Sequence, residues 1–163
     1  MIIRNAIGLL LLALLSASAY WYWQIQTPRP APEVSFNTIK GQTLALNALK
    51  GKPAVVTFWA TDCPSCIEEI PHLISLHHRY RQRDLTVIAV AMPYDPPNHV
   101  LAMAESRQIP YAVALDPNGE LVKAFGDVRL TPTTFLIDGS GNIVLQKVGA
   151  FELTEMQRQI ERL

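Results

Sequence analysis

Along the middle of the chain, short continuous hydrophobic runs alternate with a segment whose hydrophobic residues have helical spacing. Residues 52–58 (KPAVVTF) and 85–92 (LTVIAVAM) are short apolar runs rich in β-branched side chains, a pattern typical of buried strands. Between them, residues 66–80 carry apolar side chains mostly at helical spacing, namely Ile67, Ile70, Leu73, Ile74 and Leu76. The pattern therefore predicts a buried strand that runs into a helix, followed by a second buried strand.

The flanking segments continue this alternation of strands and helices. Alternating residues around Lys40-Gly41 predict an opening β-hairpin, and a Gly-Ser-Gly turn predicts a closing pair of strands. The other predicted elements are a loop and helix (93–109), a strand (111–116), a short helix and loop (120–130) and a terminal helix that Thr154 caps (153–163). Together they predict an α/β sandwich around a mixed sheet.

The N-terminal segment, residues 1–26, differs in composition from everything after it. Arg4 is its only charged side chain, and residues 6–25 are about the ~20 apolar residues that cross a bilayer as a helix. Aromatic residues 20–23 would lie at the far interface, where such rings are favoured. We expect a transmembrane anchor, or an uncleaved signal, that starts inside. Cleavage after the small residues 17–19 is the alternative, and either way the domain is exported.

A proline-rich segment follows the anchor. Residues 27–33 (TPRPAPE) contain three prolines within five residues, which predicts a stiff, extended linker. The domain would then comprise residues 34–163, long enough to bury a core without disulfide staples.

Charge excludes one class of function. Residues 31–163 carry 12 Lys+Arg and 14 Asp+Glu, a net charge of −2. This balance offers no basic surface for nucleic acid.

The only two cysteines, Cys63 and Cys66, stand at the predicted junction of strand and helix. A disulfide between them would close too short a loop to constrain the unfolded chain, which excludes a staple. Structural zinc needs about four ligands, and His72 lies roughly 9 Å beyond Cys66 along a helix, so we expect no metal site. A copper-binding chaperone of similar fold is the alternative.

Redox chemistry suits this position. A thiolate attacks disulfides, and the amides and dipole of a helix N-terminus favour negative charge on Cys63. Pro64 follows it at a position where a missing amide costs little. Cys66 is about one turn further and can close on Cys63. We therefore expect Cys63 to attack and Cys66 to resolve the mixed disulfide.

Three motifs carry a family resemblance. The order of elements, with C-x-x-C opening the first long helix, resembles the thioredoxin fold. A closer resemblance is to the membrane-anchored thiol-disulfide oxidoreductases of the TlpA/ResA type, which include the cytochrome c maturation reductants. It covers essentially the whole chain after residue 33. The matching motifs are FWATDCPSC with Glu69 and Pro71 after it, LDPNGELVKAFGDV, and TPTTFLIDGSGNIV. The resemblance implies a mixed central sheet flanked by helices, with an N-terminal β-hairpin extension, behind one N-terminal transmembrane helix.

The resemblance also implies roles for residues outside the cysteine pair. It implies a cis Thr131-Pro132 bond facing the cysteines, with the Thr131 backbone pairing with an extended substrate. It places Glu69 close to the cysteines, where a partly desolvated carboxylate could accept the proton of Cys66. A solvated helix glutamate is the alternative. Independently of the resemblance, Trp59 is expected to pack beneath the site, help to screen it and contribute to substrate binding, and simple core packing is the alternative.

One departure from the family pattern and one from the pattern of cytosolic thioredoxins concern the redox couple. Asp62 stands directly before Cys63, where Trp is common in the family, and its carboxylate opposes thiolate formation. Thr57 takes the position where cytosolic thioredoxins hold a buried acid. TlpA/ResA-type proteins also have no acid at this position. With Asp62, we assign Pro64 and Ser65 to tuning the redox couple.

These observations predict a periplasmic thiol-disulfide oxidoreductase held in the inner (cytoplasmic) membrane by a single span. An oxidising compartment needs dedicated reductants, so we expect it to reduce partner disulfides in cytochrome c maturation or at metal-site cysteines. A membrane electron donor of the DsbD/CcdA type would recharge it, and the chemistry needs no cofactor beyond the Cys63–Cys66 disulfide. A thiol peroxidase that uses Thr61 is a further alternative, although its usual upstream proline is missing.

Overall fold

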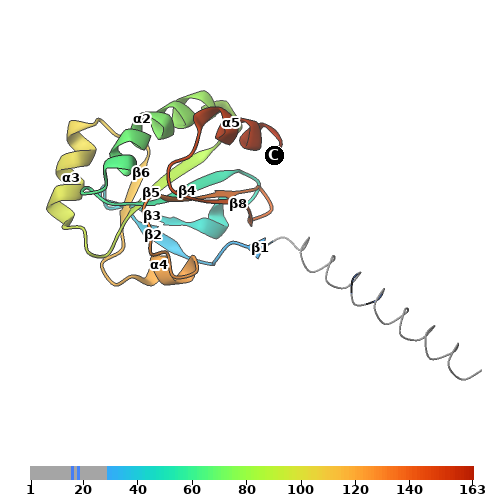
Figure 1. The fold of residues 1–163 in the computed structure, drawn as a ribbon, viewed down its shortest axis with the longest axis horizontal. Helices are drawn as coiled ribbons and strands as arrows, with labels where there is room; N and C mark the ends of the chain where they lie inside the picture. The colour runs from blue at the N-terminus through green and yellow to red at the C-terminus, as the bar shows by residue number, and fades with distance from the viewer. Residues whose placement is uncertain (1–15, 17, 19–28) are drawn as a thin grey trace, which may run out of the picture.

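The computed structural model describes Ser16, Ser18 and residues 29–163 of the chain (Figure 1). Within these residues, no helix is long and apolar enough to cross a membrane. The predicted anchor, residues 1–26, lies outside the described residues except at the two serines.

A six-stranded mixed sheet forms the centre of the domain. Its strand order is β1-β8-β7-β4-β5-β6, in which β4 is parallel to β5 and antiparallel to β7. The strands are β1 (Arg29–Pro30), β4 (Ala54–Trp59), β5 (Thr86–Ala91), β6 (Ala112–Leu115), β7 (Thr133–Ile137) and β8 (Asn142–Val148). All six residues of β4 are buried, as the apolar run predicts for a central strand. The predicted mixed sheet is therefore confirmed.

Helices cover both faces of this sheet. They are α2 (Pro64–Arg79), α3 (Pro97–Ser106), α4 (Glu120–Ala124) and α5 (Leu153–Glu161), with short 3₁₀ turns η1 (Leu46–Leu49) and η2 (Arg81–Arg83). Figure 1 shows α2 and α5 together on one face and α4 on the other.

Alternation along β4 divides the core into two clusters. Val55 and Trp59 join the cluster beneath α2, α3 and α5, whereas Val56 and Phe58 join the cluster that α4 covers. Successive side chains of a strand point to opposite faces, which is why one strand supplies both clusters.

The opening hairpin is also confirmed. Strands β2 (Ser35–Asn37) and β3 (Thr43–Ala45) pair antiparallel, and Gly41 takes a positive φ of 76° in the turn. The Ile39 N–H donates to the Val113 carbonyl, so the turn end of the hairpin lies along β6 at the edge of the sheet.

Part of the predicted linker belongs to the sheet instead of forming a free spacer. Arg29–Pro30 pairs with the start of β8, and the Ala31 N–H donates to the Gly141 carbonyl at 2.9 Å. Arg29 also donates to the Gln146 side chain. A proline lacks the N–H that a central strand needs, but an edge strand tolerates it. The spacer prediction is therefore wrong for these residues.

The predicted cap of the terminal helix is also wrong. Helix α5 begins at Leu153, so Thr154 lies inside its first turn and Glu152 takes the cap position without a side-chain hydrogen bond. The apolar positions Met156 and Ile160, both buried, fix this helix on the sheet through packing instead.

Candidate active site

The cysteine pair opens α2 at the carboxyl end of β4. Cys63 is the N-cap residue, with extended backbone, and Pro64 follows in the first turn. The Cys63 Sγ accepts the Cys66 N–H at 3.2 Å, so the sulfur itself satisfies one of the free amides of the helix end. The predicted position of the pair is confirmed.

The two sulfurs differ in their exposure. They form a disulfide with the Cα atoms 5.3 Å apart. Cys66 is 3% exposed and belongs to the core cluster under α2, whereas Cys63 is only half-buried. A sulfur on a partner protein can therefore approach Cys63 but not Cys66.

The residues assigned to redox tuning occupy different environments. The Ser65 hydroxyl lies 3.5 Å from the Cys63 Sγ, where it can donate to a thiolate. Asp62 and Pro64 are exposed. Water therefore screens the effect of the Asp62 charge on Cys63.

A buried carboxylate holds the loop between β4 and Cys63. Asp95, which follows β5, accepts both the N–H and the hydroxyl of Thr61 at 2.7 Å each. The Thr61 hydroxyl proton is thereby committed to Asp95, and this hydroxyl was the group that the peroxidase alternative used. Sequence analysis missed Asp95. Its position after a buried strand parallel to β4 was the available signal, since both strands end at the same edge of the sheet.

Glu69 is buried one turn beyond Cys66, with only 3% of its surface exposed. Its Oε1 accepts the Phe151 N–H at 2.9 Å. Burial raises the pKa of this carboxyl to about 7, and the Phe151 hydrogen bond offsets part of that increase. The alternative of a solvated helix glutamate is wrong, because α5 and the loop before it cover this side of α2.

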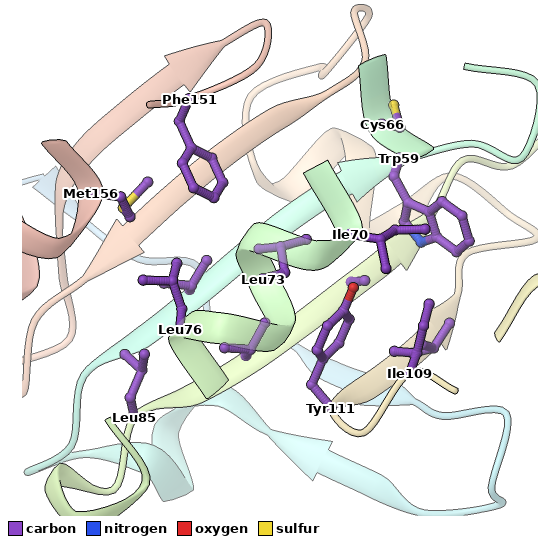
Figure 2. Close-up of a cluster of buried hydrophobic side chains, with 14 of the residues drawn as sticks. Trp59, Cys66, Ile70, Leu73, Leu76, Leu85, Ile109, Tyr111, Phe151 and Met156 are labelled. Atoms are coloured by element: carbon purple, nitrogen blue, oxygen red, sulfur yellow. The ribbon is translucent and has the colours of Figure 1, made fainter. Parts of the chain in front are cut away.

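Trp59 packs under the first turns of α2. Figure 2 shows its indole below Cys66 and beside Ile70, and the residue is 4% exposed. Among the residues that the structure describes, the Nε1 atom has no hydrogen-bond partner. Trp59 therefore lies in the core beneath the cysteines, and its contribution to substrate binding stays a prediction.

The Thr131-Pro132 bond is cis, as the resemblance implies. Thr133, the next residue, pairs with Phe58 near the end of β4, so Thr131 and Pro132 lie at the same edge of the sheet as the cysteines. Pro132 accepts a hydrogen bond from Gly149, while neither backbone group of Thr131 bonds to the part of the chain that the structure describes.

A comparison with protein families shows to which family this chain belongs. The model of the family described as Redoxin matches residues 26–162. The chain belongs to the redoxin family.

Among the relatives of this redoxin, one is named a thiol-disulfide oxidoreductase and another a thioredoxin-like protein. The thiol-disulfide oxidoreductase ResA of Halalkalibacterium halodurans is 31% identical over 111 residues, which cover 68% of this chain and 62% of ResA. The thioredoxin-like protein YneN of Bacillus subtilis is 30% identical over 133 residues, covering 80% of this chain and 76% of YneN.

A solved structure agrees with these relatives. The thiol:disulfide interchange protein of Chlorobium tepidum superposes with a TM-score of 0.76 at 31% identity, over 83% of this chain and 96% of that protein. The chain is thus a thiol-disulfide oxidoreductase of the TlpA/ResA type, which confirms the resemblance that its motifs show.

In this redoxin, Thr57 occupies the position of the buried acid of thioredoxins, but its hydroxyl does not do the chemistry of a carboxyl. Its hydroxyl shares a 2.8 Å hydrogen bond with the Thr134 hydroxyl, its partner across β4 and β7. Glu69 supplies a buried carboxyl on α2 instead, one helical turn beyond Cys66.

No group of three or more His, Cys, Asp or Glu side chains that could hold a metal ion is present among residues 29–163. His72, the histidine nearest to the cysteines in sequence, packs against the Phe151 ring with centroids 6.2 Å apart.

Proposed function

We propose that this redoxin reduces disulfides in partner proteins outside the cytoplasm, with Cys63 as the attacking sulfur and Cys66 as the resolving sulfur. The unequal burial of the two cysteines carries the assignment of roles, since a partner can reach Cys63 alone. The helix N-terminus and the Ser65 hydroxyl both favour a thiolate on Cys63.

The reaction proceeds in two exchanges. The Cys63 thiolate attacks one sulfur of the partner disulfide, and the other partner sulfur leaves as a thiolate that takes up a proton. Cys66 then loses its proton and attacks the Cys63 Sγ, which forms the Cys63–Cys66 disulfide and releases the second partner thiol. Two electrons pass from the dithiol to the partner.

Glu69 is the base for the second exchange. Cys66 is buried and cannot pass its proton directly to bulk water, and Glu69 is the buried carboxyl one helical turn away. Its pKa of about 7 suits a group that must both take and release a proton near neutral pH.

The Thr131 backbone is the proposed contact for the partner chain. Its N–H and C=O have no partner in the described part of the chain, and they lie at the same sheet edge as the cysteines. An extended segment can pair with them as an added strand, which would place a partner disulfide at Cys63.

The setting of the reaction follows from the N-terminal sequence. An apolar span at residues 6–25 with one preceding positive charge supports a single-pass inner-membrane anchor and a periplasmic or other extracytoplasmic domain. A reductant there needs electrons from a membrane donor of the DsbD/CcdA type. The full-length protein should then resist carbonate extraction from membranes. A mature chain that begins at Tyr20 would contradict the anchor.

Trapping of mixed disulfides in cells tests the roles of the two cysteines and also identifies the partner proteins. Without Cys66 no other thiol of the chain can release the mixed disulfide, because the sequence holds no third cysteine. The Cys66→Ser protein should therefore accumulate covalent adducts that dithiothreitol dissolves, whereas the Cys63→Ser control should accumulate few. Mass spectrometry of the adducts distinguishes cytochrome c maturation from metal-site cysteines. Equal adducts from both variants, or none from either, would contradict the assignment.

A further inference from the structure

The segment between β8 and α5, residues 149–151, is hydrogen-bonded to two separate parts of the candidate site. The Gly149 N–H donates to the Pro132 carbonyl at 2.8 Å, and the Phe151 N–H donates to Glu69 Oε1 at 2.9 Å. Two amides of one short segment therefore hold the residue beside the proposed partner contact and the proposed base. Neither exchange of the proposed reaction uses these amides.

The segment has little freedom between these two hydrogen bonds. Only Ala150 separates Gly149 from Phe151 in the chain. The Phe151 side chain is 5% exposed and belongs to the core cluster under α2, and Figure 2 shows its ring among the labelled side chains of that cluster. On the other side, Val148 pairs with Thr133 of β7. Because packed segments of this kind transmit strain, a change at one hydrogen bond is felt at the other.

Glu69 changes the strength of its hydrogen bond when it takes up a proton. A carboxylate accepts an N–H in a charge-assisted hydrogen bond, which is about twice as strong as one between neutral groups. Burial raises the pKa of Glu69 to about 7, so both forms of this carboxyl exist near neutral pH. The hydrogen bond from Phe151 is therefore stronger before Glu69 receives the proton of Cys66 than afterwards.

The other hydrogen bond of the segment fixes the backbone next to Thr131. Pro132 follows Thr131 through the cis bond, and its carbonyl accepts the Gly149 N–H. The Thr131 N–H and C=O have no hydrogen bond within the described residues. A well-fixed Thr131 backbone binds an extended partner segment at a smaller entropic cost than a loose one.

We propose that residues 149–151 couple partner binding at Thr131 to the proton on Glu69, so that a bound partner favours the carboxylate and proton uptake favours partner release. Gly149 and Phe151 are positioning residues, because they act through Pro132 and Glu69. The inference rests on the proposed function, and it adds a reason for the partner to leave during the second exchange.

The coupling acts at two points of the reaction. Coupling between two sites is reciprocal, so a bound partner lowers the pKa of Glu69 by the same free energy by which protonation weakens binding. A bound partner thereby prepares Glu69 to accept a proton. When the Cys66 S–H bond breaks and Glu69 takes that proton, the noncovalent hold on the partner weakens as Cys66 attacks Cys63. The coupling adds no proton and no electron to the two exchanges.

Other ionisable groups lie around the segment. His72 of α2 packs on the Phe151 ring with centroids 6.2 Å apart, and histidine changes charge near neutral pH. Lys147 of β8 and Glu152 before α5 are exposed at the two ends of the segment. Burial and the negative charge of the base raise the pKa of Tyr111 above its usual range, so this phenol keeps its proton at neutral pH. His72 is therefore the group that the experiment must separate from the base.

A mixed-disulfide equilibrium tests the coupling. The full-length Cys66→Ser protein is linked at Cys63 to a capped seven-residue peptide of valine and threonine with one central cysteine, a composition that favours an extended chain. The peptide is exchanged against 2-mercaptoethanol, which is uncharged and too short to pair with Thr131. We expect the equilibrium to favour the peptide roughly fivefold more at pH 8 than at pH 5.5, at the low end of typical coupling between two sites.

Amide NMR spectra of the same proteins follow the segment itself. The Gly149 and Phe151 amide signals should shift with one common pH midpoint. In the peptide-linked protein this midpoint should be about 0.7 pH unit lower than in the 2-mercaptoethanol-linked protein, which is the logarithm of the same fivefold factor.

Three substitutions on α2 identify the titrating group. Glu69→Gln should abolish both pH effects, because its amide oxygen can still accept the Phe151 N–H but takes up no proton. Glu68→Gln, at the exposed neighbouring acid, is the matched control and should keep both effects. His72→Gln should keep them as well.

Gly149→Ala tests whether the segment carries the coupling. Gly149 has a φ of 81° and open space at the Cβ position, so alanine strains the backbone there without a clash. Gly141→Ala is the matched control, since Gly141 has a φ of 84° and equally open surroundings in the turn between β7 and β8. The pH dependence of the peptide equilibrium should be lost in Gly149→Ala and kept in Gly141→Ala.

The remaining outcomes separate the inference from the proposed function. A peptide equilibrium that is equal at both pH values overturns the inference and leaves the proposed function standing. So does a pH dependence that persists in Glu69→Gln or in Gly149→Ala, because another group or a direct electrostatic effect then causes it. If Gly149→Ala does not fold, separate midpoints for the Gly149 and Phe151 amides overturn the inference. If the peptide does not link to Cys63, or if the protein with both cysteines does not release it, the proposed function fails as well.

Discussion

The two ends of helix α2 differ in how their polar side chains are bonded. At the far end, the Tyr80 hydroxyl donates to Glu161 at 2.9 Å, Arg79 pairs with the same carboxylate, and Arg83 donates to the Ile160 carbonyl. These three contacts give Tyr80, Arg79 and Arg83 partners in α5, and they fasten this end of the helix to α5.

At the cysteine end, several polar groups are only partly satisfied. Within residues 29–163, Glu69 is buried with one hydrogen bond, and Trp59 Nε1 has none. Such groups cost stability, because burial removes them from water without full replacement. The comparison indicates that stabilising contacts are concentrated at one end of α2, while the other end keeps groups that can exchange protons.

Glu69→Gln should produce the largest change in stability. The folded-state pKa of about 7 lies above the ordinary 4.5, so the folded state holds its proton more tightly than the unfolded state. This contribution is complete below pH 4.5 and is lost as the pH rises through about 7, a decrease of about 3 kcal/mol. Denaturant unfolding of the oxidised protein at pH 5 and pH 8 should show the decrease in wild type and a much smaller one in the variant. Equal pH dependence in both proteins would refute the assigned cause.

Thr61→Val should have the next largest effect. It leaves one oxygen of the buried Asp95 without its 2.7 Å hydrogen bond, which costs about 1–3 kcal/mol. We also expect slower attack by Cys63, because the loop that carries it is less well fixed. The control is Thr43→Val, which removes an exposed hydrogen bond to Asn37. Similar unfolding midpoints for the two variants would show that Asp95 does not anchor the loop.

Tyr80→Phe should cost about 1 kcal/mol, the usual contribution of one such hydrogen bond. It should alter neither the rate of thiol-disulfide exchange at the cysteine pair nor the reduction potential of the pair. Unfolding by denaturant and equilibration with glutathione measure the two quantities. A changed potential would show that the two ends of α2 are not as separate as their contacts indicate.

Asp62→Asn should have the smallest effect, since this side chain is exposed and screened by water. Removing its negative charge favours the Cys63 thiolate, so alkylation by iodoacetamide should begin at a slightly lower pH. The pair should also become slightly more oxidising. Glu68→Gln, an exposed acid further along α2, is the control. A shift toward higher pH in Asp62→Asn would contradict the electrostatic argument.

Local patterns were sufficient to predict the main elements of this domain. The apolar run before Phe58 and the helical spacing after Cys66 predicted β4 and α2, because burial of a strand and of a helix face leave different periods in the sequence. The C-x-x-C position followed from the same patterns, and the cis Thr131-Pro132 bond from the resemblance.

The contacts that complete the site could not be predicted in this way. Asp95 meets Thr61 across 34 residues, and Glu69 meets Phe151 across 82. Such pairs depend on how strands and helices are placed in space, and periodicity does not record that. The pairing of Arg29–Pro30 with β8 was missed for the same reason, since a proline-rich segment has no strand signature.

The account depends most directly on which sulfur first bonds to a partner. Reduced wild-type protein can be mixed with a peptide that contains one disulfide, quenched with acid within the first turnover, and mapped by mass spectrometry. We predict a mixed disulfide at Cys63 alone, which decays as the Cys63–Cys66 disulfide forms and the second peptide thiol is released. An adduct at Cys66, or comparable adducts at both cysteines, would contradict the account.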